Sequence, residues 1–277
     1  MVKNVKEQLV PENGEELTLF PPCDIIEDMK TDDLVAALDA IFEPEKFPDP
    51  SQNGLQVAGR KETKKALFAV DASLETIRKA QKEDCGLIIV HHGLFWSRPL
   101  MVRGYMKERL KALLASDIGL YAVHLPLDEH PELGNNISLA LEAGIVKDAA
   151  LASYKGVPLG IMGHYESPRS LEEAARPLKG KYQALHVIDG GRPIRKAGVI
   201  TGDAGSLLEE ILESGIDLLI SGELNHAMVH PFTESGLSGL FYGHYATERG
   251  GLLRLQEHLK RMFPTLDTLF FDNDTKL

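Results

Sequence analysis

The sequence predicts an α/β fold, in which short buried strands alternate with amphipathic helices. Apolar runs of strand length recur along the chain, and segments with a helical spacing of apolar residues separate many of them. The chain has 277 residues and 43% hydrophobic content, enough for a sizeable core in one large domain or two modest ones. These observations together favour sheets that are covered by layers of helices.

The chain opens with a polar stretch that is punctuated by proline and shows no clear periodicity. We predict an N-terminal extension over residues 1–24, an extended arm that becomes ordered where it packs on a neighbour. A helix is expected to begin near Thr31, because Asp32 and Asp33 then fall in its first turn, where carboxylates suit the helix dipole. Residues 43–60 contain several prolines and glycines and are expected to form a loop.

A first series of strands and helices follows this loop. Its strands are short apolar runs, as expected for the buried strands of a parallel sheet. The last helix predicted in this series is closed by Gly144, and glycine suits the position that ends a helix. The predicted strands are Ala66–Val70, Leu87–Val90 and Leu120–Val123, and the predicted helices are Leu74–Lys82, Met106–Ala115 and residues 135–144.

A second series begins after residues 145–165, which carry no clear chemical motif. Its predicted strands are Gly198–Ile200, Asp217–Ile220 and Leu237–Tyr242, and its predicted helices are Ser206–Glu213 and residues 250–262. The two series share an order of elements, since Asp71 and His91 are twenty residues apart, as are Thr201 and Ser221. This agreement indicates either a duplicated α/β unit or the general likeness of any two strand–helix–strand segments.

Charge and composition argue against several classes of protein. The net charge is −11, with 41 acidic and 30 basic residues, which argues against an extended nucleic-acid surface. A small anionic substrate stays compatible with this charge, because a bound metal ion supplies local positive charge. No apolar run approaches the ~18 residues of a membrane span. The chain opens without a secretory signal, so we expect a cytoplasmic protein with no membrane segment.

The sequence lacks the motifs of several common site types. Cys23 and Cys85 give no disulfide framework and no cysteine-based zinc motif. The sequence also lacks the glycine-rich motifs of P-loop and Rossmann proteins and the nucleophile motif of serine hydrolases.

Side chains that can bind metals follow three of the predicted strands. The pair His91 and His92 follows one strand, His124 follows the next, and His244 comes two residues after the last. Sites in open α/β sheets form outside the carboxyl ends of strands, where the fixed backbone positions the attached side chains. Since neutral imidazole is the commonest metal ligand, these positions predict a metal site.

The histidine pair and Asp128 each allow a second interpretation. Adjacent His91 and His92 would face opposite sides of a regular strand, but a turn at the strand end lets both rings enter one cleft. Alternatively, the pair caps the strand through backbone hydrogen bonds. Asp128 lies in a loop with His124 and His130 and offers a hard oxygen ligand for Zn, Mn, Fe or Mg, or it forms an ordinary Asx or proline turn.

Two further segments supply candidate residues near the C-terminus. His244 and Glu248 are four residues apart, so they share one face if the segment is helical. Glu248 could then bridge two ions, or it could serve the dipole of a helix N-terminus. Glu223 and His226 are candidates for metal binding, for support of the ligands or for catalytic proton transfer. The remaining histidines are expected to be surface or structural: His130, His164, His186, His230 and His258.

Five motifs, in this order, resemble the NIF three-like family, whose members are also called GTP cyclohydrolase I type 2 homologs. The motifs are NGLQVAG, IIVHHGLFW, YAVHLPLDEHPELGNNISLALEAGI, ISGELNH and YGHYATERGG. The resemblance covers the chain from about residue 28 to the C-terminus. The N-terminal extension has no counterpart in the family pattern.

The resemblance implies a two-lobed α/β fold with related lobes and a dinuclear metal site between them. We therefore expect a first lobe of residues 25–151 plus 249–277 and a second lobe of residues 152–248. The resemblance also implies a ring-shaped homohexamer. Carried over by motif, Glu248 bridges the two ions, His124 lies just outside the ligands, and the metal ligands are His91, His92, Asp128, His244 and Glu248.

Two functions fit this sequence. The first is a hydrolase that uses two divalent ions per chain, Zn, Fe or Mn, to act on a nucleotide, a phosphate ester or a cyclic amide. In this function Glu223 or His226 would move protons. The second is a non-enzymatic scaffold, metal carrier or regulatory partner. An open coordination position beside a cleft would favour the hydrolase, whereas a filled shell in a closed pocket would favour the scaffold.

Overall fold

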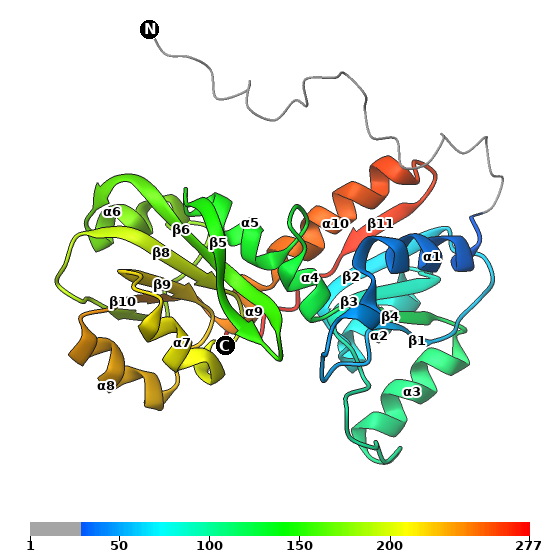
Figure 1. Cartoon of the computed structure of the whole chain (residues 1–277). Coiled ribbons are helices and arrows are strands. Elements are labelled where there is room, and N and C mark those ends of the chain that lie inside the picture. Colours follow the sequence, from blue (N-terminus) through cyan, green and yellow to red (C-terminus); the bar gives the residue numbers. More distant parts are fainter. Residues whose placement is uncertain (1–28) are drawn as a thin grey trace, which may run out of the picture.

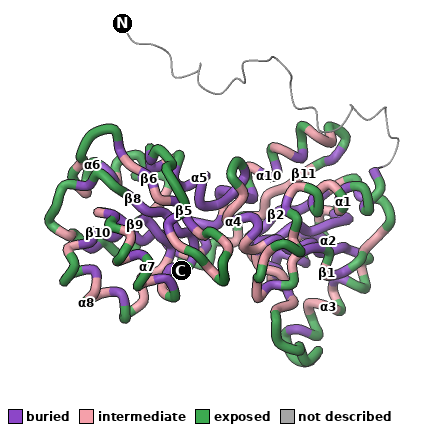
Figure 2. The backbone as a smooth tube through the Cα atoms, viewed as in Figure 1, coloured by how far each residue is buried: buried purple, intermediate pink, exposed green. Residues whose placement is uncertain are grey.

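The computed structural model describes residues 29–277, which form two α/β lobes that lie side by side (Figure 1). The arm predicted over residues 1–24 lies outside the described residues. One lobe is built on a five-stranded sheet and the other on a six-stranded sheet. Buried segments run through the middle of both lobes, and exposed segments surround them (Figure 2). The predicted two-lobed α/β fold is confirmed.

The five-stranded sheet has the order β1-β4-β3-β2-β11. Four of its strands run parallel, and β1 pairs antiparallel with β4. Its strands are β1 (Gly54–Val57), β2 (Lys65–Asp71), β3 (Leu87–His92), β4 (Gly119–Ala122) and β11 (Asp267–Phe270). The helices of this part of the chain are α1 (Thr31–Phe42), α2 (Leu74–Lys82), α3 (Tyr105–Ala115), α4 (Leu125–Glu129) and α10 (Arg249–Met262).

Helices cover both faces of this sheet, because its strands alternate their side chains between two cores. Phe68 and Val70 of β2 pack in the core with residues of α1 and α10. Leu67 and Ala69 pack in the core with residues of α2 and α3. The packing on both faces fixes the positions of the parallel strands and of the residues at their carboxyl ends.

The six-stranded sheet has the order β5-β6-β8-β9-β10-β7, with β8, β9 and β10 parallel and the other pairs antiparallel. Its strands are β5 (Val146–Tyr154), β6 (Val157–Arg169), β7 (His186–Ile188), β8 (Ile194–Ile200), β9 (Leu218–Ser221) and β10 (Ser238–Phe241). The helices of this part are α5 (Asn135–Glu142), α6 (Leu171–Ala175), α7 (Leu208–Glu213), α8 (His226–Ser235) and α9 (His244–Thr247). Short 3-10 helices are η2 (Pro44–Lys46), η3 (Arg176–Leu178) and η4 (Gly205–Leu207).

Several elements differ from the sequence predictions. The predicted loop over residues 43–60 contains η2 and β1, and the predicted loop after β4 contains α4. Strand β3 does not stop before the histidine pair but continues through it to His92. Residues 145–165 contain most of an antiparallel hairpin made of β5 and β6. A longer strand and a short helix thus carry residues that we had placed in turns.

The two series repeat one order of elements. Strands β2 and β3 flank α2, strands β8 and β9 flank α7, and each strand pair is parallel. The predicted lobe limit after residue 151 falls inside β5, which pairs with β6 along its length, and a limit before Val146 would keep that sheet whole. The division into lobes of residues 25–151 plus 249–277 and 152–248 stays a prediction.

Within residues 29–277, no helix combines the length and the apolar character needed to cross a membrane.

Candidate metal centre

The carboxyl ends of β3 and β4 lie at the same edge of the first sheet. The two strands are parallel, with Val90 opposite Ala122. His91 and His92 form the last two residues of β3, and His124 comes two residues after β4. The sheet therefore places three histidines close together, and the rings of His91 and His124 have centroids 4.9 Å apart.

Glu248 lies between three histidines. Its Oε1 is 3.4 Å from His91 Nε2 and 3.2 Å from His244 Nε2. Its Oε2 is 3.2 Å from His92 Nε2. The short helix α9 brings His244 and Glu248 to one face, as their spacing predicted. Each carboxylate oxygen thus faces a different histidine of the β3 pair.

The side chains that could bind a metal fall into three overlapping groups. In each group, the possible ligand atoms all lie within 4.8 Å of one another. The groups are His91, Asp128 and Glu248; His92, His244 and Glu248; and His91, His92 and His124. The structure therefore brings all five predicted ligands together. It also brings in His124, which we had expected just outside the ligands.

The four histidines share one hydrogen-bonding arrangement. In each ring, Nδ1 lies within hydrogen-bond distance of an oxygen. The acceptors are the Val123 carbonyl for His91 at 2.9 Å, Asp71 Oδ1 for His92 at 2.9 Å, Asp49 Oδ1 for His124 at 2.9 Å, and Glu223 Oε1 for His244 at 2.6 Å. A ring that donates its Nδ1–H in this way keeps a lone pair on Nε2, the tautomer that metal-binding histidines adopt.

Asp128 is buried at the end of α4 and is held by two donors. Its Oδ1 accepts a hydrogen bond from Asn135 Nδ2 at 2.9 Å and one from the Thr201 hydroxyl at 3.2 Å. The same oxygen is 3.6 Å from His91 Nε2. Asn135 also accepts the Gly251 N–H at 2.7 Å, which ties this region to α10.

Burial and charge oppose each other in the cluster. Burial alone would lower the pKa of His91, but the carboxylates of Asp128 and Glu248 outweigh it and raise the pKa to about 10. Burial also disfavours the charged form of His244, and its glutamate neighbours raise that pKa to about 9. At Glu248, burial would raise the pKa, but the surrounding histidines hold it well below the usual range. The carboxylates thus attract positive charge, and divalent cations can replace the ring protons.

Two buried atoms of the cluster fit a bound metal ion. Among the described residues, neither His91 Nε2 nor Glu248 Oε2 has a hydrogen-bond partner, although both are buried. A side chain at Gly202 would place its Cβ 2.3 Å from Glu248 Oε1, so glycine keeps this space open. The nitrogen and oxygen donors of the cluster suit Zn, Fe or Mn.

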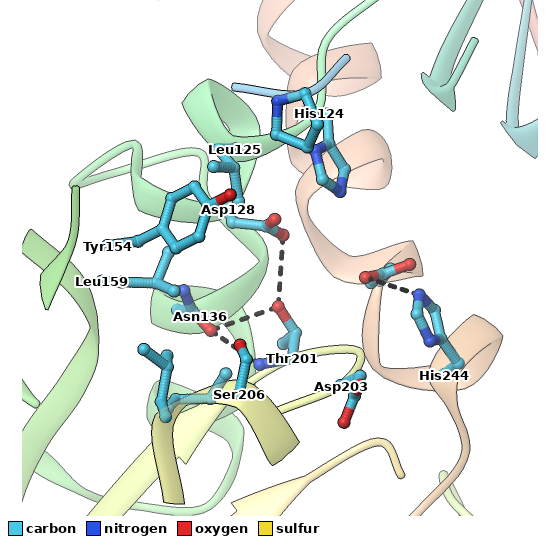
Figure 3. Close-up of a pocket in the computed structure, with 14 residues that line it drawn as sticks. His124, Leu125, Asp128, Asn136, Tyr154, Leu159, Thr201, Asp203, Ser206 and His244 are labelled. Carbon is cyan, nitrogen blue, oxygen red and sulfur yellow. Dashed lines mark hydrogen bonds and ion pairs between the residues drawn. The ribbon is translucent and has the colours of Figure 1, made fainter. Parts of the chain in front are cut away.

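A cavity of about 230 Å³ adjoins the cluster (Figure 3). Asp128, His244 and Glu248 contribute to its wall, so the candidate ligands are accessible from it. Tyr154 and Leu159, from the β5–β6 hairpin, line the side opposite His244 (Figure 3). Apolar side chains form much of the remaining lining: Pro50, Leu125, Ile200 and Leu207.

Glu223 and His226 occupy different surroundings. Glu223 is half-buried and contacts His244 Nδ1. His226 is exposed at the start of α8, where its ring centroid lies 6.3 Å from that of His230. Within the described part of the chain, His226 belongs to none of the three candidate metal-binding groups. The structure thus brings Glu223, but not His226, to the cluster.

The residues that support the ligands were not predicted from the sequence. Asp71 could have been found, because it directly follows the predicted strand Ala66–Val70, and the parallel pairing with β3 places it opposite His92. Asp49 and Thr201 carry no comparable signal. Asp49 lies in a segment that was predicted as a loop, and Thr201 reaches Asp128 only through the packing of the two lobes.

Comparisons with known proteins agree with the fold and the motifs. The model of the family Duf34/NIF3 (NGG1p interacting factor 3) matches residues 29–276. A protein of Pyrococcus horikoshii named GTP cyclohydrolase 1 type 2 homolog is 40% identical over 252 residues. That match covers 90% of this chain and 100% of the relative.

Two solved structures extend the comparison to the whole fold. The structure of protein ybgI, of unknown function, matches with a TM-score of 0.83 and 34% sequence identity. The match covers 90% of this chain and 100% of the ybgI chain. The crystal structure of TTHA1606 from Thermus thermophilus has a TM-score of 0.79 and 38% identity, with the same coverage. Sequence motifs, family model and folded structure agree, and the chain belongs to the Duf34/NIF3 family.

Proposed function

We propose that the cluster binds two divalent metal ions and that the protein is a metal-dependent hydrolase of a small substrate. The observation that carries this proposal is the position of Glu248, which belongs to two of the candidate ligand groups. One group contains His91 and Asp128, and the other contains His92 and His244. A carboxylate shared in this way suits a ligand that bridges two ions. The donor set favours Zn, Fe or Mn.

The cavity beside the cluster supports an enzyme over a scaffold or metal carrier. A catalytic metal site keeps a coordination position that a substrate can reach, whereas a purely structural site is closed. Asp128, His244 and Glu248 border a cavity of about 230 Å³, so a substrate has access to the candidate ligands. The hydrolase class also agrees with the name of the Pyrococcus horikoshii relative.

The dimensions and lining of the cavity favour a small substrate. A volume of about 230 Å³ is below the ~300–1,000 Å³ of pockets that enclose drug-sized ligands. Leu125, Leu159 and Ile200 line it together with Tyr154, which suits an apolar or planar body. A phosphate ester or a cyclic amide of ring size meets these conditions, and a complete nucleotide would extend beyond the cavity.

Each part of the cluster would have its own task. A pair of divalent ions, when bound, stabilises the attacking and leaving oxygen atoms of a displacement. The chain orients the histidine rings through their Nδ1 hydrogen bonds and holds Asp128 through two donors. The proton-transfer roles of Glu223 and His226 stay predictions; of the two, Glu223 lies beside the cluster, where it contacts His244.

The test combines metal analysis with a substrate screen. Elemental analysis of metal-replete protein should find close to two divalent ions per chain. A panel of phosphate esters and cyclic amides should then give hydrolysis with metal and none after chelation. Metal uptake without any hydrolysis would support the scaffold or carrier instead. Protein that takes up no metal on titration would overturn the proposal as a whole.

A further inference from the structure

Thr201 contacts Asp128, a candidate metal ligand at the end of α4. It follows β8 and is buried, with 6% of its surface exposed. Its hydroxyl oxygen lies 3.2 Å from Asp128 Oδ1 and 3.1 Å from Asn136 Oδ1 (Figure 3). Its backbone N–H donates to the same Asn136 oxygen at 2.8 Å. The hydroxyl has a single proton to donate, so these two oxygens compete for it.

Charge decides which acceptor receives that proton. Asn136 Oδ1 is neutral and already accepts the Thr201 backbone N–H. Asp128 is a carboxylate, and a hydrogen bond to an ionised acceptor is roughly twice as strong as one between neutral groups. The hydroxyl proton therefore points toward Asp128, where Asn135 Nδ2 is the other donor to Oδ1.

The second lobe holds the end of α4 at the next residue as well. Glu129 Oε1 accepts the Gly160 N–H of β6 at 2.8 Å and Asn136 Nδ2 at 2.6 Å. Asn136 in turn fixes the Thr201 backbone. The main chain at Thr201 is thus held independently of its hydroxyl, so a change at the hydroxyl acts on Asp128 rather than on the contact between the lobes.

We propose that Thr201 is a positioning residue for the metal centre, whose hydroxyl keeps Asp128 Oδ1 turned toward His91. The inference rests on the proposed metal function. Without the hydroxyl, Asn135 would be the one remaining donor to this buried oxygen among the described residues, and the carboxylate could rotate away from His91. Loss of such a supporting partner typically weakens metal binding ~10–100-fold.

The test compares Thr201→Val, which removes the hydroxyl at nearly constant shape, with Thr201→Ser, which keeps it. Zn²⁺ affinity is measured by competition with a chromophoric chelator, and the visible spectrum is recorded after Co²⁺ substitution. Thr201→Val should bind one of its two ions ~10–100-fold more weakly, with a changed Co²⁺ spectrum. Thr201→Ser should keep the wild-type affinity and spectrum.

Thr63→Val is the matched control, because the Thr63 hydroxyl is also buried but bonds to Thr31 instead of the cluster. It should leave Zn²⁺ affinity unchanged. Wild-type affinity in Thr201→Val, or equal losses in Thr201→Val and Thr201→Ser, would overturn the inference while leaving the metal function intact. If Thr201→Val does not fold, Thr201→Ala makes the same test with a smaller side chain. Wild-type protein that binds no Zn²⁺ would overturn the metal function and this inference together.

Discussion

The Glu248 carboxylate is only 2% exposed, so its neighbours must offset the free-energy cost of burying its charge. Nε2 atoms of His91, His92 and His244 lie within 3.4 Å of its oxygens. Removing one partner from such a buried arrangement costs far more than breaking an exposed ion pair. Glu248 is therefore the residue at which a small change should have the largest effect on the cluster.

Replacing Glu248 by Gln should remove at least one metal ion per chain. The amide keeps the size of the side chain but loses the negative charge that offsets the repulsion between two neighbouring cations. The fold should persist, because the core strands do not depend on this side chain. Metal stoichiometry and thermal midpoint are measured on one preparation. If Glu248 only served a helix dipole, the replacement would cost ~0.3–1 kcal/mol of stability and leave the metal content unchanged. Full metal occupancy in Glu248→Gln would exclude Glu248 from the site.

Replacing Gly202 by Ala should disturb the metal centre, and Gly215→Ala is the control. Both glycines have positive φ, +65° and +70°, so a Cβ costs ~1–2 kcal/mol of backbone strain at either position. At Gly202 the Cβ would also lie 2.3 Å from Glu248 Oε1, whereas at Gly215 it meets nothing within 4 Å. Gly202→Ala should lose both stability and metal, and Gly215→Ala should lose stability alone. Denaturant unfolding and elemental analysis distinguish the two, and equal metal content would contradict this role of Gly202.

At the scale of elements, the sequence predicted best the strands whose residues are buried on both faces. The segment Ala66–Val70 is apolar throughout because its side chains pack into both cores of the first lobe. Helix α4 has five residues, too few to show a helical period. Strand β11 pairs with β2, which lies far from it in the sequence, with Asp267 opposite Lys65. Elements that depend on such distant pairing leave a weak local signal.

The histidine pair shows where the prediction of the site reached its limit. We expected a turn to bring both rings into one cleft, but β3 continues to His92. The Glu248 carboxylate instead lies across the end of the strand, with one oxygen near His91 and the other near His92. Local sequence indicated the residues with metal-binding chemistry, but the supporting partners Asp49 and Thr201 come into contact only through tertiary packing.

Replacing Ser73 by Ala should destabilise the fold without changing metal content. Ser73 caps α2, and its hydroxyl accepts the Thr76 N–H at 3.0 Å. Loss of such a cap costs about 1 kcal/mol. Urea unfolding measures the loss, and Ser73→Asp, which restores a cap, should recover most of it. A fall in metal content in Ser73→Ala would contradict the expectation that loss of this cap leaves the candidate ligands in place.

At the scale of the whole molecule, the metal centre depends on both lobes. His91 and His92 end a strand of the first sheet, whereas His244 follows a strand of the second. Thr201 and Gly202, which follow β8, complete the surroundings of Asp128 and Glu248. A lobe prepared alone would therefore carry only part of the ligand set.

The chain should assemble into a hexamer. This prediction comes from the family resemblance. Light scattering should give a mass close to six chains. A monomer whose mass does not change with concentration would refute the prediction.

The order of the strands along the chain also sets when the centre can form during synthesis. Strand β2 is complete early, yet its neighbour β11 follows the entire second sheet. A chain emerging from the ribosome, N-terminus first, thus carries β2 as an unpaired edge of the first sheet until β11 has been made. Glu248 emerges almost as late, after His91, His92 and Asp128 have all been made. A nascent chain that stops before Glu248 lacks the carboxylate that two of the three ligand groups share, so those two groups are complete only after this residue has been made.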